Sequence, residues 1–189
     1  RENARAWGYR GAQVPWETGT SGVEETAPWL NLQDRELHMS ADVAYAIKLY
    51  DEVSGDPSFL LEAGAEIVMD TARIWLGLGR FVDRLGGAFG IYEVTGPDEY
   101  TACVNNNYYT NAMAQMHLAF AADVAGRLKR EHPDDFARIA AAIDLQPDEP
   151  ALWREAAEKM HLPVDEALGI HPQDDSFLQK PVWDFANTP

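Results

Sequence analysis

The sequence predicts an all-α fold in which helices occur in pairs and long loops gather at one end. Three observations predict it: apolar residues recur at helical spacing over most of the chain, short Gly-, Pro- and Ser-containing turns separate neighbouring helices, and longer irregular segments lie between the pairs. A helical barrel of the α/α kind fits this organisation better than a four-helix bundle, which would not need such long connections. Long ordered loops are usually functional, so we expect the site among them.

The N-terminal part of the chain is predicted to contain the end of a helix, a long loop and a helical hairpin. The first helix ends near residues 8–11, and the loop after it is rich in Gly, Pro and Trp. From Ser40, which we assign as an N-cap, apolar residues recur at helical spacing up to Ser54–Gly55. Asp56–Pro57 then starts the second helix of the hairpin, as N-cap and first helical position, and this helix runs to about residues 77–79.

A short β-hairpin is predicted near residues 86–104, where β-branched and aromatic residues mix with turn formers, and its turn is placed around Gly96–Pro97. Helix resumes over about 109–130. Two shorter helices are predicted at 134–143 and 150–160, and the tail after them is irregular.

Composition excludes several classes of function. The 189 residues include 15 Lys and Arg against 31 Asp and Glu, a formal net charge of −16. Such a surface repels phosphate backbones and anionic lipids, so we expect no nucleic-acid partner and no membrane partner. No apolar run approaches the length that spans a bilayer. The single cysteine, Cys103, cannot form an internal disulfide, and no apolar signal segment is visible, so we expect a cytoplasmic protein.

Metal and phosphate-loop chemistry are not indicated either. The five histidines lack the mutual spacing of a metal site, and there is no second cysteine to complete one. No Gly-rich phosphate loop ending in Lys-Ser or Lys-Thr is present. We therefore expect neither a metal nor an organic cofactor.

The stretch from Val94 to Tyr100 is the most informative for chemistry. If it is extended, the side chains of Asp98 and Glu99 point to opposite faces, so only one of them can face a pocket. Glu99 has aromatic and apolar neighbours, which raise the pKa of a carboxyl group by desolvation. An acid that is still protonated near neutrality can give a proton to a leaving oxygen. A solvated acidic turn explains the same residues, and both interpretations remain open.

The asparagine run is a second candidate for ligand binding. Asn105–Asn107 and Asn111 offer amide groups that suit a polyhydroxylated ligand such as a sugar, if aromatic faces lie beside them. A helix cap preceded by a polar turn is the alternative interpretation. The six tryptophans are possible stacking platforms, although Trp75 and Trp153 lie in predicted helices and are assigned to the core.

Several motifs occur in order along nearly the whole chain. They are Gly8–Glu17, Gly22–Glu24, His38, the Gly-Pro-Asp-Glu-Tyr element Gly96–Tyr100, Asn105–Asn111, and Gln173–Phe177. Together they resemble the central part of glycoside hydrolase family 65. That family contains inverting phosphorylases that act on maltose, trehalose, kojibiose and nigerose, together with hydrolases similar to acid trehalase.

The resemblance implies an (α/α)6 barrel, with residues 1–189 as the central portion of a single catalytic domain that is incomplete at both ends. It implies that Glu99 is the general acid. It also implies that the sugar pocket is lined by Trp16, Glu17, Glu24, His38, Asn105 and Asn106. The family's Trp-Asp-x-Glu motif is expected before residue 1. Its Lys-Gln-Ala-Asp motif and its phosphate-binding Ser and His loops are expected after residue 189.

An inverting phosphorylase needs one carboxylic acid, because phosphate itself attacks the anomeric carbon. An inverting hydrolase also needs a base carboxylate, roughly 6.5–9.5 Å from the acid. We expect phosphorolysis of trehalose or maltose to β-glucose 1-phosphate and glucose, with inorganic phosphate as co-substrate. A trehalose hydrolase of the same family and a non-catalytic carbohydrate-binding helical domain are the alternatives.

The resemblance also bears on assembly. It implies that the longer protein is a homodimer. A partial barrel leaves apolar helix faces open, so we expect the isolated 189 residues to be inactive and either self-associating or marginally stable.

Overall fold

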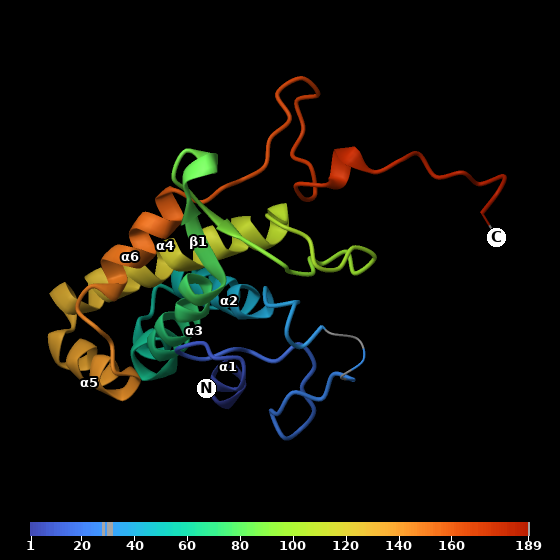
Figure 1. Cartoon of the computed structure of the whole chain (residues 1–189). Coiled ribbons are helices and arrows are strands. Elements are labelled where there is room, and N and C mark those ends of the chain that lie inside the picture. Colours follow the sequence, from blue (N-terminus) through green and yellow to red (C-terminus); the bar gives the residue numbers. More distant parts are fainter. Residues whose placement is uncertain (28, 30–31, 189) are drawn as a thin grey trace.

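The computed structural model describes residues 1–27, 29 and 32–188 (Figure 1). The described part does not include residues 28, 30–31 and 189. The first three belong to the predicted N-terminal loop, and all four belong to the predicted domain. The described chain is mostly helical with one small two-stranded sheet, which confirms the predicted predominance of helix. None of its described helices is long and apolar enough to cross a membrane.

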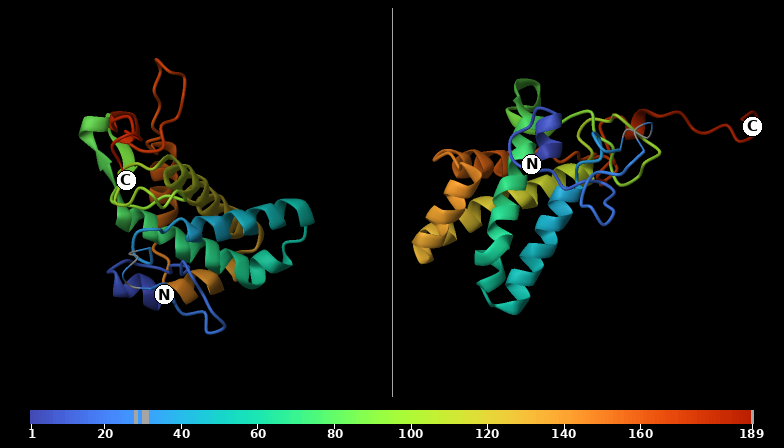
Figure 2. Two further views of the ribbon diagram at one scale, coloured as in Figure 1. Left: turned by 90° about the vertical axis from the view of Figure 1, so that its right-hand side faces the viewer. Right: turned by 90° about the horizontal axis from the view of Figure 1, so that it is seen from below.

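Six α-helices form the frame of the described chain: α1 (Glu2–Ala6), α2 (Met39–Ser54), α3 (Ala65–Leu78), α4 (Tyr108–Glu131), α5 (Pro133–Ile143) and α6 (Glu149–Glu158). A π-helical turn, Leu60–Gly64, leads into α3. Helix α4 lies at the centre and packs against α2, α3, α5 and α6, as Figures 1 and 2 show. Trp75 of α3 and Trp153 of α6 are completely buried, which confirms their assignment to the core.

The helix limits follow local signals, with one exception. Asp56 begins the second arm of the hairpin as predicted, since its Oδ1 accepts a hydrogen bond from the Ser58 N–H at 2.9 Å. Ser40, however, is not the N-cap of α2, because that helix already begins at Met39. The buried Ser40 hydroxyl instead accepts a hydrogen bond from the Val14 N–H at 3.1 Å. A long-range contact with the N-terminal loop thus replaces the expected local one.

The β-hairpin lies earlier in the chain than predicted. Strands β1 (Gly79–Val82) and β2 (Ala88–Ile91) pair antiparallel, with Gly79 opposite Ile91 and Val82 opposite Ala88. Its connection contains Gly86 and Gly87, both at positive φ, and not the predicted Gly96–Pro97 turn. Two consecutive glycines can adopt the left-handed conformations that close a tight connection, so they decide where the chain reverses.

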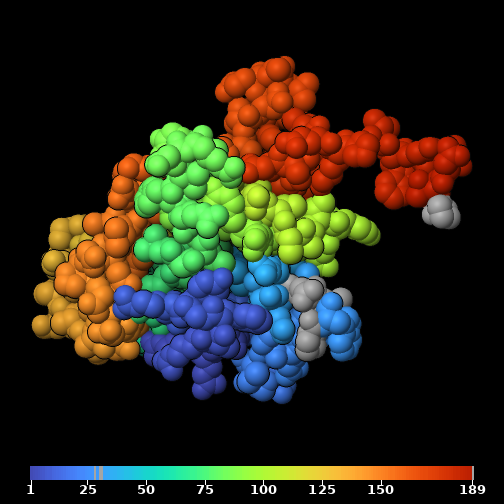
Figure 3. Space-filling model, viewed as in Figure 1, coloured from blue at the N-terminus to red at the C-terminus, as the bar shows by residue number. Residues whose placement is uncertain are grey.

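Three irregular segments meet at the end of the molecule where α2 and α4 begin: the N-terminal loop, the loop after β2, and the C-terminal tail (Figure 1). The Thr95 N–H donates to the Arg35 carbonyl at 2.9 Å, which joins the first two. The Asp175 N–H donates to the Asn105 carbonyl at 3.1 Å, which joins the last two. In Figure 3 the tail, the loop after β2 and the N-terminal loop lie one above another on this side.

A stripe on α2 is apolar and exposed. Tyr45, Leu49 and Val53 follow one another at four-residue spacing, with 50%, 48% and 78% of their surfaces exposed. We expect the isolated chain to self-associate through this stripe, and light scattering measures the result. The double variant Leu49→Glu/Val53→Glu should shift the population towards monomer. A wild-type chain that stays monomeric at high concentration would contradict the prediction.

Candidate active site

Glu99 lies in a loop whose two ends are tied together. Val94 and Val104 exchange backbone hydrogen bonds of 3.0 and 2.9 Å and so close the loop. Asp98 anchors it to the tail, because its Oδ2 accepts a hydrogen bond from Gln173 Nε2 at 2.9 Å, and this bond lowers the pKa of Asp98. The exposed carboxylate of Glu99 makes no hydrogen bond or ion pair with any described residue. Of the two acidic side chains, Glu99 is therefore the one available to a ligand.

The expected apolar shield around Glu99 is not found in the described chain. Glu99 is exposed, and the side chain of its neighbour Tyr100 is completely exposed. Neighbours in the sequence do not desolvate a carboxyl group in a surface turn, because burial requires a second segment to cover it. The carboxyl group that other segments do bury is that of Glu36.

Glu36 was not among the residues predicted from the sequence. It is 2% exposed and lies close to the Glu99 loop. Burial, followed by the negative charges of Glu99 and Asp42, raises the pKa of Glu36 to about 7. Its position two residues before His38 is the only signal that the sequence offers. Without that signal, a single glutamate between Arg35 and Leu37 would be predicted to be solvent-exposed.

His38 connects Glu36 to two aromatic rings. Its Nε2 lies 3.5 Å from Glu36 Oε1, and burial lowers the pKa of the imidazole. The Trp16 ring lies edge-on to it at 6.1 Å between centroids, and the Tyr109 ring at 5.3 Å. The structure thus brings together Trp16 and His38, which the sequence assigned to the same pocket.

Glu24 fixes the loop that carries Trp16. Its carboxylate accepts hydrogen bonds from the backbone N–H groups of Trp16, Glu17 and Thr26 at 2.8, 3.3 and 3.0 Å, and a fourth from the Thr26 hydroxyl. Burial acts to raise the pKa of Glu24, but the bonds from Thr26 and the two backbone groups outweigh it and lower the pKa. In this structure Glu24 positions the loop, while the side chain of Glu17 is exposed.

The asparagine run holds the segments together. Asn107 caps α4, since its Oδ1 accepts from the Thr110 N–H at 3.0 Å, which supports the helix-cap interpretation. Asn106 is completely buried, and its Nδ2 donates to Asp175 Oδ2 at 2.7 Å. Asn105 is exposed. Of the two asparagines assigned to the pocket, Asn105 is accessible to a ligand and Asn106 is committed to the protein interior.

Gly96 is required by this arrangement. A Cβ at this position would lie 2.3 Å from Nδ2 of Asn107, so the cap of α4 would have to move. We expect Gly96→Ala to lower the free energy of unfolding by about 0.5–2 kcal/mol, the usual cost of losing an N-cap. Gly126→Ala is the matched control: it lies inside α4 and meets only an Arg130 side-chain atom at 3.4 Å. The control should be neutral or stabilising in urea unfolding, and equal losses for both variants would refute the argument.

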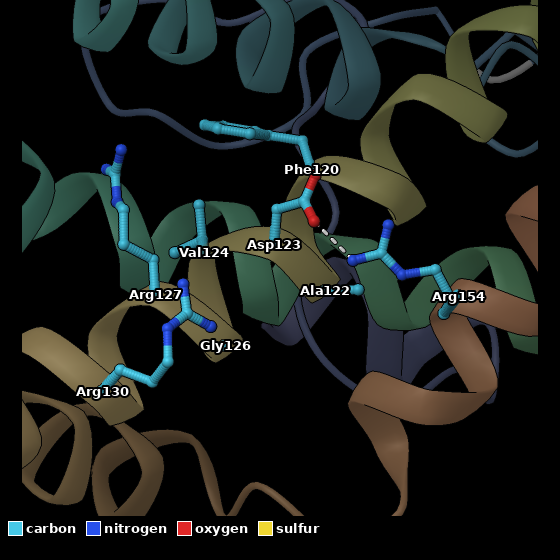
Figure 4. Close-up of a pocket in the computed structure, with 8 residues that line it drawn as sticks. All are labelled: Phe120, Ala122, Asp123, Val124, Gly126, Arg127, Arg130 and Arg154. Carbon is cyan, nitrogen blue, oxygen red and sulfur yellow. Dashed lines mark hydrogen bonds and ion pairs between the residues drawn. The ribbon is translucent and has the colours of Figure 1, made fainter.

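A separate cavity of about 300 Å³ lies between α4 and α6 (Figure 4). None of the site residues predicted from the sequence lines it. Arg154 forms an ion pair with Asp123 there, and Arg127 forms one with Asp51 at 2.9 Å. These arginines are therefore engaged with carboxylates of the protein itself. In the part of the chain that the structure describes, no group of three or more His, Cys, Asp or Glu side chains is placed to hold a metal ion.

Residues 1–188 match the profile described as the glycosyl hydrolase family 65 central catalytic domain. The chain therefore belongs to glycosyl hydrolase family 65. Relatives in this family that bear the name phosphorylase are enzymes.

The relatives include two kinds of disaccharide phosphorylase. The chain is 46% identical to an alpha,alpha-trehalose phosphorylase of Geobacillus stearothermophilus, over 100% of this chain and 24% of that protein. It is 36% identical to a kojibiose phosphorylase of Caldanaerobacter subterraneus subsp. tengcongensis, over 95% of this chain and 24% of that protein. The chain thus spans about a quarter of the length of these curated relatives.

A solved structure shows the same fold. It is a provisionally named kojibiose phosphorylase from the human microbiome, with a TM-score of 0.80 and 24% identity. The match covers 94% of this chain and 24% of that one. The arrangement of helices and loops described above is therefore the same as that of about a quarter of that chain.

Proposed function

We propose that these residues are the central portion of an (α/α)6-barrel catalytic domain that cleaves an α-linked disaccharide with inorganic phosphate. Trehalose is the first substrate to consider, because the trehalose phosphorylase relative is 46% identical to this chain. Kojibiose follows from the second relative, and maltose from the motif resemblance. The products are β-glucose 1-phosphate and a second sugar.

The observation that carries the proposal is the position of Glu99. Its carboxyl group stands free in a loop tied at both ends, while the neighbouring Asp98 is anchored by Gln173. In its protonated form Glu99 gives a proton to the glycosidic oxygen, and phosphate attacks the anomeric carbon from the opposite face. The half-buried ring of Trp16, which lies edge-on to the buried His38, offers an apolar surface for the sugar. No base carboxylate is required, since phosphate is itself the nucleophile.

The same proposal covers the setting of the reaction. The domain uses no metal and no organic cofactor, inorganic phosphate being the co-substrate. The protein works in the cytoplasm, in keeping with its single, exposed cysteine, and forms a homodimer. Phosphate capture needs local positive charge in an otherwise acidic chain, so we place that site on segments outside these 189 residues.

Product analysis of the full-length protein tests the function. Trehalose, kojibiose and maltose are each incubated with and without inorganic phosphate, and the sugars released are identified. Glucose 1-phosphate that forms only with phosphate supports the proposal and names the substrate. Free glucose that forms equally fast without phosphate would identify a hydrolase of the same family. No cleavage of any disaccharide would favour a binding domain.

A further inference from the structure

Glu36 stands out among the buried polar groups. It is 2% exposed, and neither of its carboxyl oxygens has a hydrogen-bond partner among the described residues. An ionised carboxylate without partners is costly in such a place, whereas a protonated one is much less so. A buried group of this kind needs an explanation, and in the described chain the imidazole of His38, 3.5 Å from Oε1, is the basic side chain paired with it.

The groups that face Glu36 come from several elements. His38 lies on its own segment, Asp42 on α2 and Glu99 on the loop after β2; Tyr109 of α4 reaches Asp42 through a 2.8 Å hydrogen bond from its hydroxyl group. Two of these groups act on Glu36 through their charge, and both of them, Glu99 and Asp42, are carboxylates.

Among the described residues, no cation offsets these carboxylates. The guanidinium of the adjacent Arg35 is directed to Asp34 and Glu93, at 3.5 and 3.3 Å. These surroundings therefore raise the pKa of Glu36 to about 7, so that its carboxyl group is mostly neutral at lower pH.

A neutral Glu36 suits its neighbour. Burial lowers the pKa of His38 and raises that of Glu36, so at pH values just below the pKa of Glu36 the pair consists mainly of a carboxylic acid and an uncharged imidazole. The acid has a proton to direct at Nε2, 3.5 Å from Oε1, and a small approach of the two groups completes that hydrogen bond. The proton of the ring then resides on Nδ1, which is buried and has no partner in the described chain. One carboxyl proton would thus determine both the tautomer and the orientation of the ring.

We propose that Glu36 is a positioning residue of the sugar site, whose protonated carboxyl group orients His38 and, through that ring, Trp16 and Tyr109. The inference rests on the proposed function only in placing the sugar against these rings. The effect reaches Trp16 and Tyr109 through their ring contacts with His38, at 6.1 and 5.3 Å, because neither residue forms a hydrogen bond with Glu36. When Glu36 ionises, the buried charge recruits water or donors, and the rings lose their fixed arrangement.

The consequence is a pH-dependent substrate affinity. If only the protein with neutral Glu36 binds sugar well, the apparent affinity falls with the fraction of that form. A group that titrates at about pH 7 then raises KM of the wild-type full-length protein by about 30-fold at pH 8.5, with a smaller effect on kcat. Glu36→Gln keeps a neutral side chain with an N–H donor, so its KM should stay near the acid-limit value across this range. Glu36→Leu, which has no donor, should have a raised KM at every pH.

Kinetics with trehalose between pH 5.5 and 8.5 separate the possible outcomes. A flat KM for the wild type would overturn the proposal. A large fall in kcat for Glu36→Gln at all pH values would also overturn it, and would make Glu36 a reacting group. Rescue by Gln but not by Leu, confined to KM, is the expected result.

Thermal unfolding provides a readout that needs no substrate. The folded protein holds the Glu36 proton more tightly than the unfolded chain does, so the wild type loses stability as the pH rises towards 7. Glu36→Gln lacks this loss, and its melting temperature relative to the wild type should rise between pH 5.5 and 8.5. If this shift is seen but no disaccharide is cleaved, the proposed function fails while the buried neutral carboxyl stands. If cleavage occurs without the shift, the inference about Glu36 fails alone.

Discussion

Replacing Glu99 with Gln in the full-length protein is expected to lower kcat/KM for disaccharide cleavage by about 10²–10⁴-fold, the usual worth of general acid catalysis. Gln cannot supply the proton that the leaving oxygen needs. Glu99 makes no hydrogen bond with the described residues, so the substitution should leave the fold unchanged. Steady-state rates with trehalose and phosphate measure the loss, and unfolding curves check the fold.

Asp98→Asn is the matched control. This neighbour lies in the same exposed turn and carries the same charge, but its side chain anchors the loop to Gln173. Asn keeps an oxygen that can accept that hydrogen bond, so we expect a loss of less than tenfold. An equal loss of kcat/KM in both variants would mean that the substitutions disturb the loop, and that the loss does not report on general acid catalysis. A fully active Glu99→Gln protein would remove Glu99 from the mechanism.

The largest expected effect on stability belongs to Arg73 of α3. Its Nε and Nη2 form a fork with the two oxygens of Glu149, at 2.9 and 2.7 Å, and its Nη1 bonds to Asp70 at 3.0 Å. All three side chains are less than a tenth exposed. This buried network joins α3 to the start of α6. Among the described cations, Asp70 without Arg73 keeps only the pair with the half-exposed Arg1. Glu149 keeps only Arg10 at 3.8 Å, so both buried carboxylates lose most of their compensation.

Arg73→Met should therefore lower the free energy of unfolding by about 3–5 kcal/mol. Arg154→Met is the control, because the Arg154–Asp123 pair is 40% and 66% exposed, and its loss should cost about 0–1 kcal/mol. Urea unfolding of the three proteins gives the comparison. Similar urea midpoints for the two variants would show that the buried network contributes no more to stability than an exposed ion pair does.

Several features were predictable because their causes are local. The helices α2 to α6 follow from apolar spacing, and Asp56 and Asn107 act as caps through bonds to N–H groups two and three residues ahead. The same locality explains one error. Ser40 has the residue type of a cap, but its hydroxyl is taken by Val14, far away in the sequence. The hairpin was misplaced because two candidate turns, Gly86–Gly87 and Gly96–Pro97, carry similar signals.

By itself, the sequence determined the helical class through apolar spacing, and the resemblance to family 65 through motifs that occur in order along the chain. That resemblance, and not residue type or spacing alone, singled out Glu99 as the candidate acid. Only the tertiary structure decided which polar groups are buried. It left Glu99 exposed, occupied the Glu24 carboxylate with four donors, and enclosed Glu36 beside His38. Burial and the approach of like charges depend on segments tens of residues apart, such as Glu36 and Glu99. For that reason the carboxyl group that titrates near neutrality could not be identified from its neighbours in the sequence.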